Sequence, residues 1–250
     1  MFEHTRESAK GWYLLLDSLF ICRTGAEEAA LIRQLVERKS VCVLSFLNAH
    51  GANIAWRNSE FLKYLADSDV LVRDGVGLSI LLRILGCDAG LNLNGTDFIP
   101  KLLNELPHDR SIAVYGTKEL WLNKTITLIR SLGFKTVYAE HGFHQDEYYS
   151  RRYTEQRPSL VILGMGMPKQ ERVALLIRSS AIMADVPTLI INGGAVIDFM
   201  ANRFPRAPHW MRQWEIEWLF RLMQEPKRLW RRNIGSIVFL YRALLTRCFR

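Results

Sequence analysis

The 250-residue sequence contains no apolar run approaching the ~20 residues that a membrane-spanning helix needs. The longest candidate, from Trp12 to Cys22, is interrupted by Asp17 and lacks a small-residue cleavage site, so we expect a short amphipathic segment rather than a signal peptide. Cysteine is also scarce. The four cysteines show no metal-site spacing, which favours reduced thiols and a cytosolic protein.

Acidic residues are scarce at the end of the chain. Residues 203–250 carry 11 Lys and Arg against 3 Glu, whereas residues 1–202 carry 22 of each sign. The last 48 residues therefore hold the whole net charge of +8. Because a basic tail on a neutral body implies an anionic partner, we divide the chain into a core, residues 1–202, and a basic, aromatic helical appendage, residues 203–250.

The core alternates short β-rich runs with helical patterns. Near-continuous apolar runs, typical of strands buried on both faces of a parallel sheet, span residues 41–47, 70–73, 111–115, 135–139, 160–163 and 188–191. Helical patterns lie between them, for example at residues 49–66, 97–105, 118–131 and 169–180. This alternation predicts an α/β fold with a Rossmann-like, mostly parallel sheet and flanking helices.

Polar or glycine-rich residues follow five of these runs. They are Asn48 and residues 74–77, 116–117, 164–166 and 192–194. Ligands of such sheets bind at the carboxyl ends of the strands. These strand exits are therefore the candidate binding positions.

Residues 164–171, Gly-Met-Gly-Met-Pro-Lys-Gln-Glu, follow a strand and open a helix. Gly164 and Gly166 would let a phosphate approach the backbone closely. Pro168 suits a first helical turn, whose N–H groups attract an anion, and Lys169 could add a positive charge. The segment is neither a Walker A loop nor a three-glycine dinucleotide fingerprint, which argues against a dehydrogenase. A tight strand-to-helix turn without a ligand is the alternative.

Three other places each allow two interpretations. Asp74, at a strand end, could take a proton from an attacking hydroxyl or could cap the next helix. Thr96 or Asp97 could likewise be a helix cap. His141 and His144 have a spacing that could suit a metal, but no acidic or cysteine partner lies nearby in the sequence, so we assign no metal site.

The tail combines aromatic and basic residues. Trp210, Trp214 and Trp218 recur every four residues and share one helical face. A second apolar face runs from Ile234 to Leu245. The charge comes from Arg228, Arg231, Arg232, Arg242 and Arg247. A basic amphipathic helix of this kind lies in the interface of an anionic membrane, and an ordinary helix packed on the core is the alternative.

Taken in order, several segments resemble the TagA/WecG/CpsF family of bacterial glycosyltransferases (glycosyltransferase family 26), over roughly residues 40–233. The matching positions are Asn48, Asp74-Gly75-Val76-Gly77, Gly95-Thr96-Asp97, residues 166–171, Asp198-Phe199, Arg206-Ala207-Pro208, residues 217–221 and Glu225-Pro226. The resemblance implies an inverting, metal-independent transfer from a UDP-sugar to a sugar on a polyprenyl diphosphate lipid, without a cofactor. It implies a cytoplasmic protein, peripheral on the inner face of the cytoplasmic membrane, in cell-surface polysaccharide or teichoic acid biosynthesis.

The resemblance also implies residue roles. Asp74 would be the catalytic base, and Asn48 and Gln170 would line the donor pocket. The strand exits and the matching motifs together give a donor-binding set of Asn48, Thr96, Gly116, Gly164, Gly166, Lys169, Gln170 and Glu171. The leaving diphosphate gains negative charge, and Arg203, Arg206 and Arg221 are the appendage residues that could stabilise it.

Two positions depart from the family. Many members have Thr where this chain has Phe46 and Arg where it has Asn92, which leaves the donor sugar open between N-acetylmannosamine, glucose and a uronic acid. The rival interpretation is a non-catalytic nucleotide-binding module whose basic tail holds an anionic polymer or membrane. No RNA- or DNA-binding motif is present, so we expect no nucleic acid partner, while a homo-oligomer is compatible with the sequence.

Overall fold

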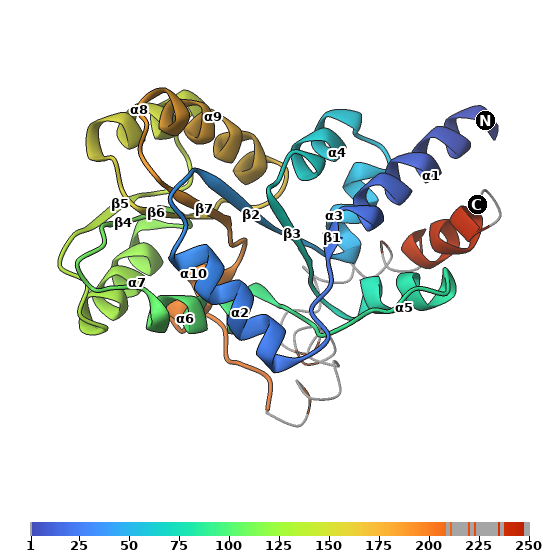
Figure 1. Cartoon of the computed structure of the whole chain (residues 1–250), viewed down its shortest axis with the longest axis horizontal. Coiled ribbons are helices and arrows are strands. Elements are labelled where there is room, and N and C mark those ends of the chain that lie inside the picture. The colour runs from blue at the N-terminus through green and yellow to red at the C-terminus, as the bar shows by residue number, and fades with distance from the viewer. Residues whose placement is uncertain are drawn as a thin grey trace.

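The computed structural model describes residues 2–208 and 238–247, with Met211, Phe220, Met223 and Gly235, and gives the surroundings of side chains from Arg6 onward. It contains a seven-stranded sheet in which neighbouring strands run parallel, in the order β1-β3-β2-β7-β6-β4-β5 (Figure 1). The strands are β1 (Leu19–Phe20), β2 (Cys42–Leu47), β3 (Val70–Arg73), β4 (Ile112–Gly116), β5 (Val137–Glu140), β6 (Leu160–Gly164) and β7 (Leu189–Asn192). The predicted α/β class and parallel sheet are confirmed.

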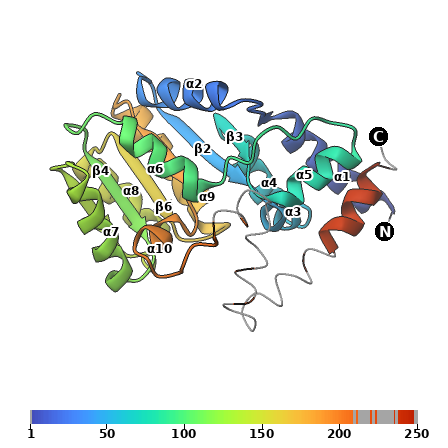
Figure 2. The ribbon, with the colours of Figure 1, turned by 90° about the horizontal axis from the view of Figure 1, so that it is seen from below.

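Helices cover both faces of the sheet (Figure 2). Those on one face are α2 (Gly25–Val36), α6 (Gly95–Glu105), α7 (Glu119–Ser131) and α10 (Val196–Met200). Those on the other face are α8 (Asp146–Gln156) and α9 (Lys169–Met183), beside α1 (Phe2–Asp17), α3 (Ala49–Ala55), α4 (Ser59–Ala66) and α5 (Val76–Ile84). Within the described residues, the two faces of the sheet are thus covered, and the edges where the strands begin and end are not part of these layers.

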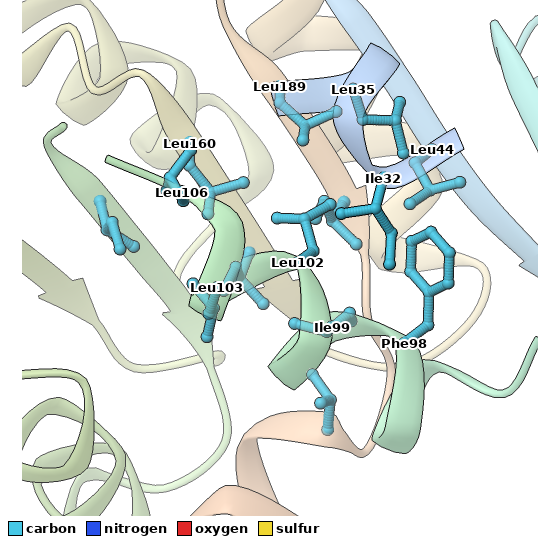
Figure 3. Close-up of a cluster of buried hydrophobic side chains, with 14 of the residues drawn as sticks. Ile32, Leu35, Leu44, Phe98, Ile99, Leu102, Leu103, Leu106, Leu160 and Leu189 are labelled. Atoms are coloured by element: carbon cyan, nitrogen blue, oxygen red, sulfur yellow. The ribbon is translucent and has the colours of Figure 1, made fainter. Parts of the chain in front are cut away.

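Aliphatic side chains form the core between the sheet and the first of these layers (Figure 3). They include Ile32 and Leu35 of α2, Ile99, Leu102 and Leu103 of α6, and Leu44, Leu160 and Leu189 of the strands. Each fully buried Leu or Ile contributes ~1.5–3 kcal/mol relative to an exposed one. Successive strand residues point to opposite faces, so Val43 packs instead with Tyr149 of α8 and Val173 of α9.

Asparagine side chains set where several helices begin. The predicted helix over residues 49–66 is wrong in one respect: it is two helices, because α3 ends at Ala55 and α4 starts at Ser59. Asn58 Oδ1 accepts the Phe61 N–H at 3.0 Å and so caps a new helix instead of continuing the old one.

Residues 238–247 form a helix that lies beside α1 (Figures 1 and 2). Phe239 is 1% exposed, and its ring lies 5.3 Å from that of Trp12. The Tyr13 hydroxyl donates to the Thr246 carbonyl at 2.9 Å. This part of the tail is therefore packed on the core.

Arg242 corrects one expectation about the tail. Arg242 is one of the residues expected to give a basic amphipathic helix its charge, yet its side chain is buried and its Nη1 donates to Asn53 Oδ1 at 2.6 Å. The guanidinium also lies over the Trp56 ring, 5.4 Å from its centre. Burial lowers the pKa of Arg242 to about 10.

Candidate active site

The neighbouring parallel strands β2 and β7 lead to helices on opposite faces of the sheet. β2 leads into α3 and then α4, which contacts α9, whereas β7 leads into α10, which contacts α6 and α7 on the opposite face. In α/β sheets, ligands bind at the carboxyl ends of the strands where neighbouring strands lead to opposite faces. The candidate site is therefore centred on Asn48, after β2, and residues 193–194, after β7.

Asp74 lies next to Asn48 at this position. The Asp74 backbone N–H donates to the Leu47 carbonyl at 2.8 Å, and Asn48 Nδ2 donates to Asp74 Oδ2 at 3.4 Å. Asn48 Oδ1 meanwhile accepts the Gly51 N–H and caps α3. The alternative that Asp74 caps α5 is wrong, because the cap is Gly75, with a φ of 84° and no side-chain bond. The Asp74 carboxylate is therefore half-buried beside Asn48.

A buried arginine fixes the turn that carries Asp74. Arg73 is 2% exposed, and its guanidinium donates to the carbonyls of Gly75, Ala89 and Gly90 at 2.9–3.1 Å. Asn92 Oδ1 accepts the Gly75 N–H at 2.7 Å. Because a buried charge is stable only when its donors are satisfied, these bonds hold Gly75, directly after Asp74, together with residues 89–92. No local sequence pattern distinguishes Arg73 from an ordinary strand residue.

The first turn of α6 adjoins the exits of β2 and β7. Its cap is Asn94, whose Oδ1 accepts the Asp97 N–H at 2.9 Å, so the proposal that Thr96 or Asp97 is the cap is wrong. A Cβ on Gly95 would lie 3.7 Å from the Gly193 carbonyl oxygen. The N-terminal end of this helix, which favours anions, thus faces the candidate site.

Arg206 attaches the start of the appendage to α6. Pro100 has no N–H to give to the Thr96 carbonyl four residues earlier, and Arg206 Nη2 donates to that oxygen at 3.3 Å. The same Nη2 lies 2.6 Å from Asp97 Oδ1. Because Pro100 cannot donate to it, the Thr96 carbonyl is free to accept a hydrogen bond from Arg206 of the appendage.

Gly116 and Gly164 end neighbouring strands and touch each other. A Cβ on Gly116 would lie 2.4 Å from the Gly164 carbonyl oxygen, so close packing alone requires glycine there. Beside them, Thr117 Oγ1 donates to Asp198 Oδ1 at 2.5 Å, and Arg203 Nη1 pairs with the same oxygen at 3.0 Å. A second appendage arginine is thus attached to the carboxyl edge.

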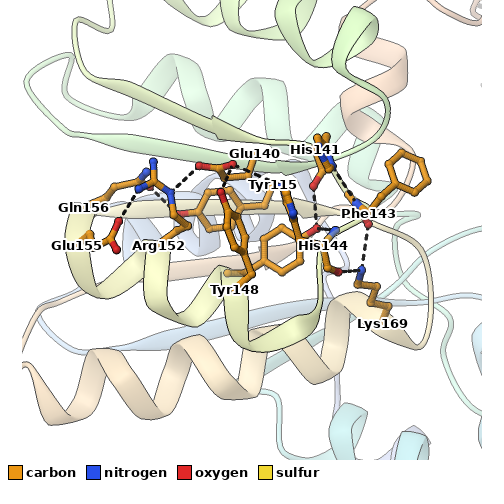
Figure 4. A network of polar contacts seen from close by, with 12 residues as sticks. Tyr115, Glu140, His141, Phe143, His144, Tyr148, Arg152, Glu155, Gln156 and Lys169 are labelled. Carbon is orange, nitrogen blue, oxygen red and sulfur yellow. Dashed lines mark hydrogen bonds and ion pairs between the residues drawn. The ribbon is translucent and has the colours of Figure 1, made fainter.

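Lys169 holds the loop that follows β5 (Figure 4). Its ammonium donates to the carbonyls of Gly142 and His144 at 3.1 and 2.5 Å. The His141 and His144 rings stack with centroids 4.0 Å apart, and the Tyr149 hydroxyl donates to the His141 carbonyl at 2.7 Å. Burial and the neighbouring His141 hold the pKa of His144 below its usual range.

Glu140 is the acidic partner that the sequence analysis overlooked in this loop. Its carboxylate accepts from the Tyr148 hydroxyl at 2.9 Å and from Arg152 Nε at 2.6 Å, and lies 3.9 Å from His144 Nε2 (Figure 4). The two carboxylate oxygens thus link the end of β5 to α8. Within the described part of the chain, no group of three or more His, Cys, Asp or Glu side chains is arranged to hold a metal ion.

Gln170 and Glu171 begin α9 and are buried, with 0% and 1% of their surface exposed. Gln170 Oε1 accepts the Gly194 N–H at 3.2 Å, and Gln170 Nε2 donates to Glu171 Oε1 at 2.9 Å. Burial raises the pKa of Glu171 to about 7, against the opposing effect of the bond from Gln170. This pair joins the exits of β6 and β7.

Known glycosyltransferases resemble this chain over most of its length. The profile described as "Glycosyl transferase WecG/TagA/CpsF family" matches residues 15–250. The chain belongs to this family. A Bacillus subtilis (strain 168) protein named N-acetylglucosaminyldiphosphoundecaprenol N-acetyl-beta-D-mannosaminyltransferase is 25% identical over 209 residues, which cover 82% of this chain and 80% of the relative.

Relatives with the same name occur in other bacteria. The protein of Staphylococcus aureus (strain MW2) is 23% identical over 200 residues, covering 78% of this chain and 76% of the relative. That of Bacillus spizizenii (strain ATCC 23059 / NRRL B-14472 / W23) is 22% identical over 185 residues, covering 72% and 70%. The similarity therefore extends over most of each chain.

In this member of the WecG/TagA/CpsF family, most of the predicted site residues lie at one edge of the sheet. Asn48 contacts Asp74, and Thr96 contacts Arg206. Phe46, a departure from the family pattern, is 5% exposed and packs edge-on against Phe98, so it is a core residue. Arg221, Trp210, Trp214 and Trp218 lie outside the described residues. Among residues 2–208 and 238–247, no helix is both long and apolar enough to traverse a bilayer.

Proposed function

We propose that this protein is a metal-independent, inverting glycosyltransferase that moves a hexose from a UDP-sugar to a sugar on a polyprenyl diphosphate lipid. The family membership supports sugar transfer, and the relatives' name, which specifies a sugar-diphosphoundecaprenol acceptor, supports the acceptor class. An acceptor of this kind resides in a membrane, so we propose that the enzyme works on the cytoplasmic face. The contact of Asp74 with Asn48 carries the catalytic part of the proposal.

The proposed reaction is a single displacement at the anomeric carbon. Asp74 takes the proton from the acceptor hydroxyl, whose oxygen forms the new bond as the bond to the UDP oxygen breaks. Attack from the side opposite the leaving group inverts the anomeric centre. Asn48 donates to Asp74 Oδ2 and so orients the carboxylate, which Arg73 and Asn92 place through the backbone.

The donor would lie along the other strand exits. Thr96 opens a helix whose N-terminal end favours the diphosphate, and the exits of β4 and β6 bring backbone close to it at Gly116, Gly164 and Gly166. Lys169, Gln170 and Glu171 hold the surrounding loops together. Arg203 and Arg206 reach the same edge through Asp198 and Asp97, and with Arg221 they could balance the charge of the leaving UDP.

Replacing Asp74 by Asn tests the base. We expect transfer to fall by about 10²–10⁴, because Asn cannot take a proton, while the affinity for UDP stays near that of the wild type. The assay would measure labelled sugar passed to a polyprenyl-diphosphate sugar, and calorimetry would measure UDP binding. The matched control is Asp88→Asn, an exposed aspartate paired with Arg23. A turnover of Asp74→Asn equal to that of the control would refute the role of Asp74.

The same assay compares UDP-N-acetylmannosamine, UDP-glucose and a UDP-uronic acid as donors, with EDTA present throughout. The proposed metal-free reaction keeps its rate in EDTA for the sugar that the enzyme uses. A wild-type protein that binds UDP but transfers none of these sugars would instead support the non-catalytic nucleotide-binding module.

A further inference from the structure

Two polar side chains in the first turn of α9 are almost completely buried, although a residue that contacts a ligand needs an accessible polar atom. Gln170 is 0% and Glu171 1% exposed. Most buried polar groups in proteins are held by hydrogen bonds, and each of these two is bonded to the other. A carboxyl that is 1% exposed cannot touch a donor without rearrangement, so Glu171 needs a different explanation from direct binding.

Glu171 determines how the Gln170 amide is oriented. An amide has one accepting end and one donating end, and the neighbours decide which end points where. Glu171 Oε1 accepts from Gln170 Nε2 at 2.9 Å, which leaves Gln170 Oε1 for the Gly194 N–H at 3.2 Å. A reversed amide would set its NH2 group against the Gly194 N–H, and both would then lack an acceptor.

The Gly194 turn in turn meets the exit of β6. The Gly193 N–H donates to the Leu163 carbonyl at 2.8 Å, and a Cβ on Gly164 would lie 2.8 Å from the Gly194 carbonyl oxygen. The Gln170 amide bonds the same turn from the start of α9. The exits of β6 and β7 are therefore held in one relative position by the Glu171–Gln170–Gly194 chain.

We propose that Glu171 is a positioning residue for the donor pocket: it orients the Gln170 amide, which fixes the 193–194 turn against the exit of β6. This inference rests on the proposed function, because it takes the pocket to be the donor site. Glu171 then acts on donor affinity through Gln170 and Gly194 and does not contact the donor.

A neutral Glu171 is compatible with this role. Burial raises the pKa of the carboxyl to about 7, and among the described residues Glu171 Oε2 and the buried Asn192 Oδ1 have no hydrogen-bond donor. The carbonyl oxygen of a neutral acid or of an amide can accept from Gln170 Nε2 as a carboxylate does. Gln at position 171 should therefore preserve the orientation, whereas Ala should lose it.

The decisive experiment compares Glu171→Ala and Glu171→Gln with Val173→Ala. Val173 is a buried control residue on the same helix, and its side chain belongs to a hydrophobic cluster. We expect Glu171→Ala to raise the KM for the UDP-sugar about tenfold with kcat within about threefold, as for one misplaced hydrogen-bond group. Glu171→Gln should restore the wild-type KM. Val173→Ala should lower Tm without changing KM.

A measurement without any donor separates this inference from the proposed function. Hydrogen exchange of the Gly194 amide should be about tenfold faster in Glu171→Ala and unchanged in Glu171→Gln. Unchanged Gly194 exchange in Glu171→Ala overturns the inference whatever the enzyme transfers. So does a KM that rises equally in Val173→Ala, or one that Glu171→Gln fails to restore. A wild-type protein without transferase activity, but with the expected exchange pattern, overturns only the proposed function.

Discussion

Arg73 is a permanently charged, buried side chain one residue before the proposed base. Its planar guanidinium reaches three carbonyls of two different segments, Gly75 on one side and Ala89 and Gly90 on the other. A lysine ammonium cannot present donors in that fixed, planar arrangement. Arg73 thus holds the turn after Asp74 from a buried position, as we propose that Glu171 does for the Gln170 amide.

Glu171 makes stability depend on pH. Its pKa is about 7 in the folded protein against an ordinary value of 4.5, because burial disfavours the charged carboxylate. A raised pKa stabilises the fold below pH 4.5, and this stabilisation is lost as the pH rises to 7, by about 3 kcal/mol in all. Glu171→Gln, which cannot ionise, should therefore have the same free energy of unfolding as the wild type near pH 4.5 and exceed it by about 3 kcal/mol at pH 8.

Denaturant unfolding at several pH values measures this difference. The control is Glu147→Gln on α8, an exposed carboxyl whose replacement should change little at any pH. A Glu171→Gln difference that stays constant from pH 4.5 to pH 8 would show that Glu171 ionises as an ordinary carboxyl in the folded protein.

Single residues differed in how far the sequence could place them. Asp74 and Asn48 were predictable as neighbours of the site, because each follows a strand and the carboxyl ends of parallel strands share an edge. The partners of Lys169 were not, since the carbonyls that it bonds come from a loop 25 to 27 residues earlier. A local sequence pattern cannot show whether a charged side chain binds a ligand or a distant loop, because that depends on the tertiary structure.

At the scale of elements, the strands β2 to β7 were predicted because short, near-continuous apolar runs between turn residues favour buried strands. β1 was missed, since two residues are too few for a pattern, and it exists through pairing with β3. α8 was missed because most of its residues are polar, although Tyr149 and Tyr153 bury one face. Periodicity therefore finds elements that bury many side chains and overlooks those that bury a few large ones.

For the helix of residues 238–247, the sequence pattern also predicted the wrong buried face. The sequence marks Tyr241 and Leu245 as the apolar face, yet Tyr241 is 63% exposed, and Phe239, Ala243 and Thr246 on the opposite side are buried. The aromatic and small residues fit against α1, where Phe239 meets Trp12. This helix is part of the core even if its outer face has a second role.

Replacing Phe239 by Ala tests that assignment. The phenyl ring is 1% exposed and contacts Trp12, so its removal should lower the free energy of unfolding by about 3 kcal/mol. Leu244→Ala, on the exposed side of the same helix at 56% exposure, should change it by less than about 0.5 kcal/mol. Thermal unfolding of both variants gives the comparison. Equal stability of the two would mean that the helix does not pack on α1 in solution.

At the scale of the whole molecule, the division into core and appendage stays a prediction, but the contacts restrict it. Arg203 and Arg206 attach the first residues of the appendage to the carboxyl edge, and Phe239 attaches its last part to α1. The sequence could not give this arrangement, nor the strand order, because both depend on pairings between segments far apart in the chain. A truncation after Glu225 would remove core residues along with the basic charge, and so it cannot isolate the charge.

Charge substitution tests the tail at an anionic membrane and leaves Phe239 in place. Residues 227–250 carry seven Lys and Arg and no acidic residue. Each such charge near an anionic surface contributes about 1 kcal/mol at moderate salt. Replacing Arg228, Arg231 and Arg232 by Gln should therefore weaken binding to phosphatidylserine vesicles about 100-fold in a sedimentation assay, since 1.4 kcal/mol corresponds to a factor of ten.

The matched control removes three exposed charges from the edge of the sheet where the strands begin. Lys39 and Lys135 precede β2 and β5, and Arg130 lies in the last turn of α7, so all three are far from the strand exits. Their replacement by Gln lowers the net charge by the same amount, and a membrane that recognises only net charge would treat both triple variants alike. We expect the control to bind vesicles like the wild type, and both proteins to dissociate at high salt, because salt screens exposed charges. Equal loss of binding in the two triple variants would show that total charge, rather than the appendage, brings this glycosyltransferase to the membrane.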